Sequence, residues 1–131
     1  MARYENILQA IGHTPLVRLR RIGADVASLI YAKVESLNPG GSVKDRVGFA
    51  MVEAAEKAGL LKPRGTIIEA TAGNTGVGLA LVAAVKGYRL IVVLPDKMSA
   101  EKISLLRAYG AEVVITATDV PPRGEKVTAK R

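Results

Sequence analysis

The sequence predicts an α/β fold in which a parallel sheet and its helices form three layers. Three short runs rich in β-branched residues follow one another in the second half of the chain, at residues 66–70, 90–94 and 112–116. Two helical stretches, residues 74–86 and 99–109, separate them. This alternation is typical of doubly wound α/β domains. Because the second and third runs are almost continuously apolar, we expect strands that are buried on both faces.

The two helical stretches carry signals at their ends. Gly87 and Gly110 follow them directly and suit the left-handed position that closes a helix. Ser99 is expected to cap the later helix, with Glu101 in its first turn. Residues 74–86 are apolar on every side, so this helix is predicted to be buried and to need a covering element on its outer side.

A further helix is expected upstream, over residues 42–58. Ser42 is predicted to cap it, and Asp45 three residues later forms a weaker version of the capping box. Apolar residues recur there at helical spacing and predict one buried face, made of Val43, Val47, Ala50, Ala54 and Ala58. Two strand-like runs precede this helix, at residues 16–19 and 29–35, without an evident partner in the parallel sheet.

Composition excludes several classes of protein. Of the 131 residues, 49% are hydrophobic and none is cysteine, which excludes a wholly disordered chain, disulfides and thiolate catalysis. The longest apolar run, residues 77–85, is much shorter than the ~20 residues that cross a bilayer, and the first residues do not resemble a signal peptide. One histidine without any cysteine predicts no metal site. We therefore expect a cytosolic protein that does not enter a membrane.

The net charge of +7, from 19 basic and 12 acidic residues, raises the possibility of nucleic-acid binding. Much of the excess lies at the end of the chain, where residues 123–131 carry four bases and one acid. The four tyrosines and one phenylalanine form no cluster that would stack on bases. This distribution argues against a nucleic-acid partner. Residues 120–131 are instead expected to form a basic, disordered tail.

The first segment that suggests chemistry lies at residues 38–46, which read Asn-Pro-Gly-Gly-Ser-Val-Lys-Asp-Arg. The glycine pair lets the backbone approach another group closely. Lys44 follows in the first turn of the expected helix, where a second positive charge is disfavoured, and its presence there suggests a role as a nucleophile. The alternative is that Lys44, Asp45 and Arg46 are simply a solvated, charged first turn.

The second segment lies at residues 71–78, between a predicted strand and the apolar helix. A turn at the carboxyl end of a parallel strand is where α/β sheets bind ligands. Free amides at a helix N-terminus suit an anion such as a carboxylate or phosphate. The alternative is a tight turn that needs its glycines only for steric reasons.

Together these segments resemble the fold type II, or β-family, pyridoxal-phosphate enzymes, and within them the branch that holds cysteine synthase and cystathionine β-synthase. The resemblance rests on residues 11–19, 38–46 and 71–76 and continues through residues 95–102 and 106–112. It implies the N-terminal α/β domain of that fold, with pyridoxal phosphate as cofactor.

The resemblance also implies roles for individual residues. Lys44 would bind the cofactor covalently and move the substrate's α-proton, and Asn74 would hydrogen-bond the ring hydroxyl. The substrate carboxylate would be held by the loop of Thr71, Ala72, Gly73 and Thr75. The implied reaction is β-replacement in sulfur amino-acid biosynthesis, in which sulfide or another thiol replaces a leaving group on a small amino acid. Family members of this kind are expected to be homo-oligomers.

The sequence departs from the family pattern in two ways. Ala72 stands where the family usually has serine, which removes one hydroxyl contact to the carboxylate. Family members are also much longer, so the phosphate-binding loop and the second domain are expected to lie outside this chain. Residues 1–36 would then pack on that absent domain, residues 37–119 would form the small α/β domain, and apolar surface would remain exposed. A fragment inactive by itself, or a non-catalytic interaction module that keeps only the fold, is the alternative to an enzyme.

Overall fold

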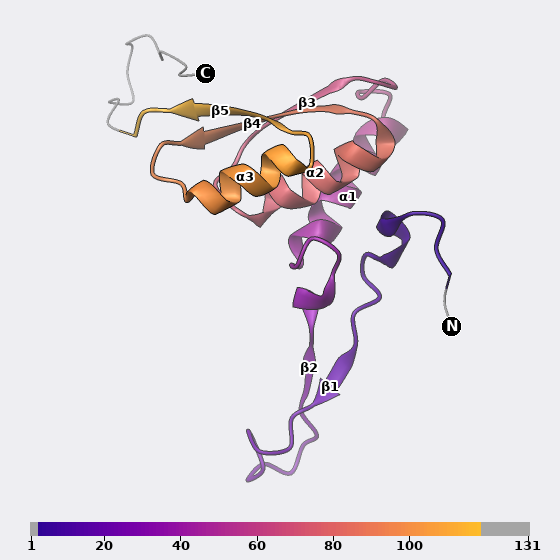
Figure 1. Ribbon diagram of the computed structural model, residues 1–131. Helices are drawn as coiled ribbons and strands as arrows, with labels where there is room; N and C mark the ends of the chain where they lie inside the picture. Colours follow the sequence, from indigo (N-terminus) through magenta and orange to yellow (C-terminus); the bar gives the residue numbers. More distant parts are fainter. Residues whose placement is uncertain (1–2, 119–131) are drawn as a thin grey trace.

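The computed structural model describes residues 3–118 of the chain, so the expected tail at residues 120–131 lies outside the described part. Two parts are visible in Figure 1, an α/β body and a long hairpin that extends from it. The elements, in chain order, are η1 (Ile7–Ala10), β1 (Leu16–Arg18), β2 (Tyr31–Lys33), η2 (Glu35–Leu37), α1 (Lys44–Lys57), β3 (Thr66–Ala70), α2 (Asn74–Lys86), β4 (Arg89–Pro95), α3 (Ala100–Ala108) and β5 (Glu112–Thr116).

The predicted α/β fold with a parallel sheet is confirmed. The three strands lie in the order β3-β4-β5 and all pairs are parallel. Because both crossovers run in the same direction along the sheet, right-handed connections place α2 and α3 on the same face, as Figure 1 shows. Beneath α2 lies α1. The layers are therefore ordered sheet, α2 with α3, then α1.

Among the described strands of the sheet only β4 has fully buried residues, and they lie on one of its faces. The expectation that the second and third runs form strands buried on both faces is therefore wrong. Leu90, Val92 and Leu94 of β4 face the helices and are buried, while the alternating residues between them are only partly covered. Ile68 of β3, on the uncovered face, is 66% exposed. The period of two along a strand explains this division.

The central position of α2 agrees with the prediction of a buried helix. Residues 76–83 are all buried, between the sheet on one side and α1 on the other. The two helices cross at Gly48 and Gly78, where a Cβ atom on Gly48 would lie 2.6 Å from the Gly78 carbonyl carbon. Helix backbones approach this closely only where side chains are missing.

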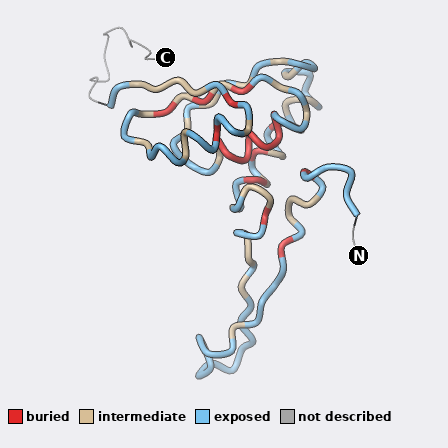
Figure 2. Tube along the Cα trace, in the orientation of Figure 1, coloured by how far each residue is buried: buried red, intermediate tan, exposed pale blue. Residues whose placement is uncertain are grey.

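The helix α1 corrects two sequence expectations. It begins at Lys44, with Val43 as its N-cap, and Ser42 only accepts a hydrogen bond from the Lys44 amide through its Oγ. Its buried residues are Asp45, Gly48 and Val52, whereas the predicted apolar face of Val43, Val47, Ala50, Ala54 and Ala58 is exposed. The glycine crossing determines how the helix is rotated, because Gly48 must face α2. The burial pattern can be followed in Figure 2.

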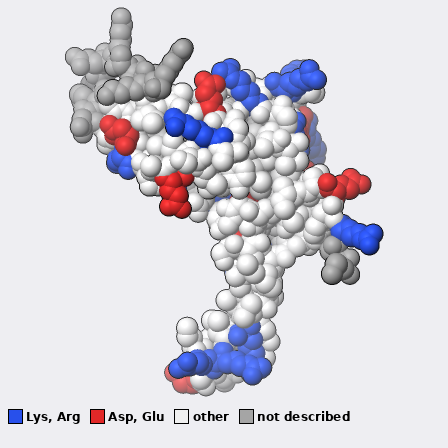
Figure 3. Space-filling view, viewed as in Figure 1, with Lys and Arg blue, Asp and Glu red and all other residues white. Residues whose placement is uncertain are grey.

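The two early strands pair with each other instead of joining the sheet. β1 and β2 are antiparallel, with Val17 opposite Ala32. Much of the hairpin is exposed (Figure 2), including Ile22, which is 74% exposed in the connecting loop. In Figure 3 basic side chains gather at the far end of this hairpin, while acidic and basic side chains intermingle over the body. That the hairpin packs on a second domain stays a prediction.

Candidate active site

The N-termini of α1 and α2 meet, and they bring two predicted site residues to the same place. Lys44 is the first residue of α1, and its carbonyl oxygen would lie 2.5 Å from a Cβ atom on Gly78 of α2. Asn74 precedes Gly78 by four residues, so it lies one turn earlier on the side of α2 that faces α1. The Lys44 side chain is exposed, and its amine has no hydrogen-bond or ion-pair partner within residues 3–118.

The loop after β3 presents free amides at the start of α2. Gly73 is the N-cap of α2 in an extended conformation, and no side chain caps this helix end. The Thr71 hydroxyl accepts a hydrogen bond of 3.2 Å from the Gly73 amide, which folds the loop back on itself. The amides of Asn74 and Thr75 have no partner within the helix. With Ala72 and Gly73 exposed, this turn can accept an anion through its backbone.

A depression of about 500 Å³ opens beside Asn74. One wall is formed by Gly40, from the glycine-containing loop before α1, and by Val77 of α2. The opposite wall is formed by residues of α3, namely Glu101, Lys102, Ser104, Leu105 and Ala108. Lys44 and Thr71 do not line this depression. Asn74 is therefore the predicted site residue that connects the two glycine-containing loops with an open cavity.

Asp45 holds the loop at residues 38–42, although the sequence indicated only a weak capping role or a solvated, charged first turn for this residue. The Asp45 side chain is completely buried, and its Oδ2 accepts a hydrogen bond of 2.5 Å from the Gly40 amide. Burial raises the pKa of this carboxyl, a shift that the hydrogen bond from Gly40 opposes. Gly41 has a φ of +81°, the left-handed conformation that turns the chain into the helix.

A polar cluster ties the base of the hairpin to the start of α1. The Arg46 guanidinium binds both carboxylate oxygens of Glu35, at 2.8 and 3.0 Å, and donates to the carbonyl oxygen of Gly12 at 2.9 Å. Thr14 and Asn38 also donate to the Glu35 carboxylate. The hydrogen bond from Arg46, followed by that from Thr14, lowers the pKa of Glu35 to about 2. Apart from the Asn38–Glu35 contact, this cluster joins residues 11 to 34 positions apart in sequence, and no local pattern revealed it.

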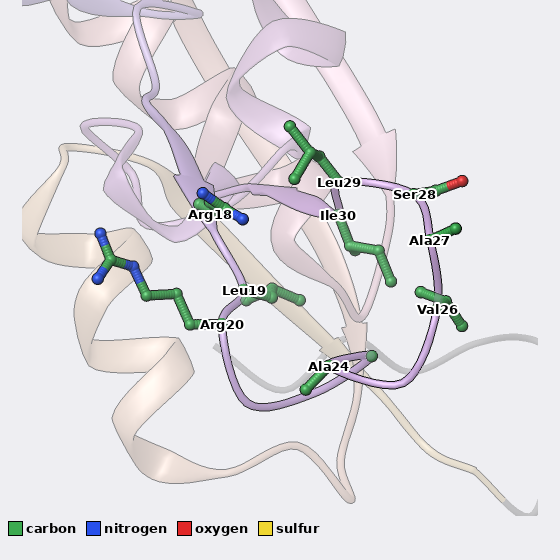
Figure 4. Close-up of a pocket in the computed structure, with 10 residues that line it drawn as sticks. Arg18, Leu19, Arg20, Ala24, Val26, Ala27, Ser28, Leu29 and Ile30 are labelled. Carbon is green, nitrogen blue, oxygen red and sulfur yellow. The ribbon is translucent and has the colours of Figure 1, made fainter.

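A second cavity lies away from these loops, within the turn of the hairpin (Figure 4). It measures about 520 Å³ and is lined by residues 18–30, among them Arg18, Arg20, Val26 and Ile30. It shares no residue with the two glycine-containing loops, so the predicted chemistry does not involve it. Within residues 3–118 the structure forms no acidic or histidine cluster suited to a metal ion, and no helix there is long and apolar enough to span a membrane.

Comparison with known proteins gives consistent matches. Residues 7–131 match the sequence model of a family described as pyridoxal-phosphate dependent enzyme. Cystathionine beta-synthase of Rattus norvegicus is 59% identical over 116 residues, which cover 87% of this chain and 21% of that protein. Cysteine synthase of Staphylococcus aureus is 51% identical over 126 residues, which cover 96% of this chain and 41% of that protein.

Solved structures agree with the sequence matches. A hydrogen sulfide-producing enzyme from Fusobacterium nucleatum superposes with a TM-score of 0.85 at 48% identity and covers 91% of this chain and 39% of its own. O-ureido-L-serine synthase gives a TM-score of 0.84 at 47% identity, with 93% and 38% covered. The chain thus spans less than half the length of these relatives.

Proposed function

The chain belongs to the family of pyridoxal-phosphate-dependent enzymes, and from that premise we propose that it supplies the lysine and asparagine side of an active site for β-replacement in sulfur amino-acid biosynthesis. The observation that supports this most is the close approach of the Lys44 backbone to Gly78, which follows Asn74 by four residues on α2. In this proposal, the enzyme needs a lysine and a hydrogen-bonding amide from this part of its fold, and Lys44 and Asn74 would supply them.

The groups present suit the cofactor. Lys44 offers an exposed amine without a partner in the described residues, and it would hold the cofactor covalently and move the substrate's α-proton. Asn74 offers an exposed side-chain amide that would hydrogen-bond the ring hydroxyl. When bound, the cofactor supplies an electron sink, while the protein supplies orientation and electrostatics. No residue of the described part is assigned to the cofactor phosphate.

The substrate would be an amino acid whose carboxylate binds at the start of α2. Thr71, Ala72, Gly73 and Thr75 surround the free amides there, and a helix N-terminus favours an anion. Relatives named cysteine synthase and cystathionine beta-synthase match about equally well, so sulfide and homocysteine are both proposed as the incoming thiol. We also propose that the protein is cytosolic and forms a homo-oligomer.

A second candidate function, a non-catalytic interaction module, is favoured by exposed apolar surface. Leu60 is 83% exposed and Ile68 66%, beside the uncovered apolar residues of α1. Such surface is typical of a face that another protein or another copy covers. Size-exclusion chromatography with light scattering tests this expectation, because a monodisperse monomer at high protein concentration would contradict it.

The enzyme proposal is tested by reaction of Lys44 with the cofactor. The chain is mixed with pyridoxal phosphate, its visible absorption is recorded, and the product is reduced with borohydride and mapped by peptide. We expect one labelled peptide, containing Lys44, and its loss in Lys44→Ala. Lys102→Ala is the matched control, because Lys102 lies beside the same depression and should leave the labelling unchanged. Labelling spread evenly over the lysines of both variants would refute the proposal.

A further inference from the structure

We propose that Asp45 is a positioning residue. Its buried carboxyl holds the Gly40–Gly41 turn and so fixes the position of Lys44 relative to the cavity beside Asn74. This inference rests on the proposed function for its purpose. Its structural part concerns only the described residues, and hydrogen exchange of the Gly40 amide tests that part without the cofactor.

Asp45 is held on two sides. Its Oδ2 accepts the hydrogen bond from the Gly40 amide, and a Cβ atom on Gly40 would lie 2.5 Å from its Oδ1. On the other side its backbone touches α2, since a Cβ atom on Gly78 would lie 3.1 Å from the Asp45 Cα. The residue therefore occupies a space bounded by the loop on one side and by a helix on the other.

What Asp45 holds is part of the candidate site. Gly40 lines the depression together with Asn74 and Val77, and Lys44 is the neighbour of Asp45 in sequence. Because a single carboxyl connects this wall to the first turn of α1, loss of its hydrogen bond would release the wall while leaving the helix in place. Asp45 would then act through Gly40 and Lys44 and would not touch the substrate itself.

The Asp45 carboxyl is also an unusual group for a contact that is purely structural. It is completely buried, yet its Oδ1 has no hydrogen-bond partner within residues 3–118. An unpartnered, buried polar atom destabilises the folded chain, and an apolar side chain of similar size would avoid this loss. A helix cap alone does not require it either, since Asp45 lies inside the helix and bonds five residues back along the chain.

The experiment compares three substitutions in the full chain. Asp45→Asn keeps an oxygen that can accept from the Gly40 amide, whereas Asp45→Ala removes it. Val52→Ala is the matched control, because Val52 is also buried in α1 but lies two turns away from the loop. Hydrogen exchange of the Gly40 amide is measured by NMR, and the reaction of Lys44 with pyridoxal phosphate is measured by borohydride reduction and peptide mapping.

We expect the Gly40 amide of Asp45→Ala to exchange at least tenfold faster than in the wild type, and the preference of the label for Lys44 to be lost. Asp45→Asn should restore both, and Val52→Ala should change neither, although it lowers stability. Unchanged Gly40 exchange in a folded Asp45→Ala variant would overturn the inference, as would equal loss of Lys44 labelling in Val52→Ala. A third outcome separates the two proposals. If no lysine of the wild type is labelled preferentially but Gly40 exchange still depends on Asp45, the proposed function is wrong, whereas the inference that Asp45 holds the Gly40–Gly41 turn is supported.

Discussion

Because α1 and α2 cross at Gly78, adding a single methyl group at this position should strongly lower the free energy of unfolding. In Gly78→Ala the new Cβ would lie 2.5 Å from the carbonyl oxygen of Lys44 and 3.0 Å from its carbonyl carbon. Both are backbone atoms, so no side-chain rotation relieves the contact. Ordinary van der Waals contact begins near 3.4 Å, and α1 must therefore move by about 0.9 Å, carrying Lys44 with it.

Two effects of opposite sign determine how far Gly78→Ala changes the free energy of unfolding. Alanine is favoured over glycine inside a helix by about 0.5–1 kcal/mol. Overpacking a close-packed interior costs about 1–3 kcal/mol, and rigid backbone neighbours place this site at the upper end. We expect a net loss of about 2 kcal/mol in the free energy of unfolding, which corresponds to a fall of roughly 5–10 °C in Tm for a chain of this size.

Urea unfolding followed by far-ultraviolet circular dichroism measures the loss, and Gly76→Ala is the control in the same helix. A Cβ atom on Gly76 would meet only side-chain atoms, at 3.0 Å from Thr71, 3.6 Å from Val92 and 3.7 Å from Leu106. Side chains can adjust by a few tenths of an ångström, so Gly76→Ala should stay within about 1 kcal/mol of the wild type. A Gly78→Ala variant as stable as Gly76→Ala would refute the close-approach argument.

Three further predictions concern the polar cluster, the carboxylate loop and the uncovered faces. Because the pKa of Glu35 is lowered from 4.5 to about 2, its contribution to stability is complete above its unfolded pKa and is lost as pH falls toward 2. The difference in urea midpoint between the wild type and Glu35→Gln should therefore shrink as the pH falls from 5 to 2, and a constant difference would contradict this. Ala72→Ser adds a hydroxyl beside the free amides of α2. It should tighten the binding of L-serine about tenfold, because it adds a hydrogen bond to the charged carboxylate. An NMR titration that follows the Asn74 amide measures the binding, and unchanged affinity would mean that the carboxylate binds elsewhere. Ile68→Ser removes apolar surface without touching the buried core and should reduce self-association in light scattering, with Val92→Ser, which disrupts the core, as the contrasting variant.

The sequence predicted those elements whose cause is local. The apolar helix at residues 74–86 and the three strands end within about two residues of their expected bounds, because glycines and β-branched runs specify them directly. Ser99 caps α3 as expected, accepting from the Lys102 amide. The meeting of Lys44 with α2 is a tertiary contact, and only the family resemblance indicated it beforehand.

The errors have one physical origin, which is contact between segments distant in sequence. The periodicity of α1 predicted an apolar buried face, but the close fit of Gly48 against Gly78 rotates the helix and buries Asp45 and Val52 instead. The uncovered face of the sheet follows from strand order, which composition does not reveal. A buried carboxyl reads in sequence like any charged first turn, so the position of Asp45 was not predictable.

The register of the sheet has a consequence for how the chain folds. Thr66 pairs with Arg89, and Ile91 pairs with Glu112, so each strand meets its partner after a single helix. Contacts this local close small loops and lose little chain entropy, which favours rapid folding. We expect the sheet to assemble strand by strand as the polypeptide leaves the ribosome, with each new βα unit adding to an existing edge. The hairpin meets α1 through Gly12 and Arg46, and this junction can form before the sheet has been synthesised.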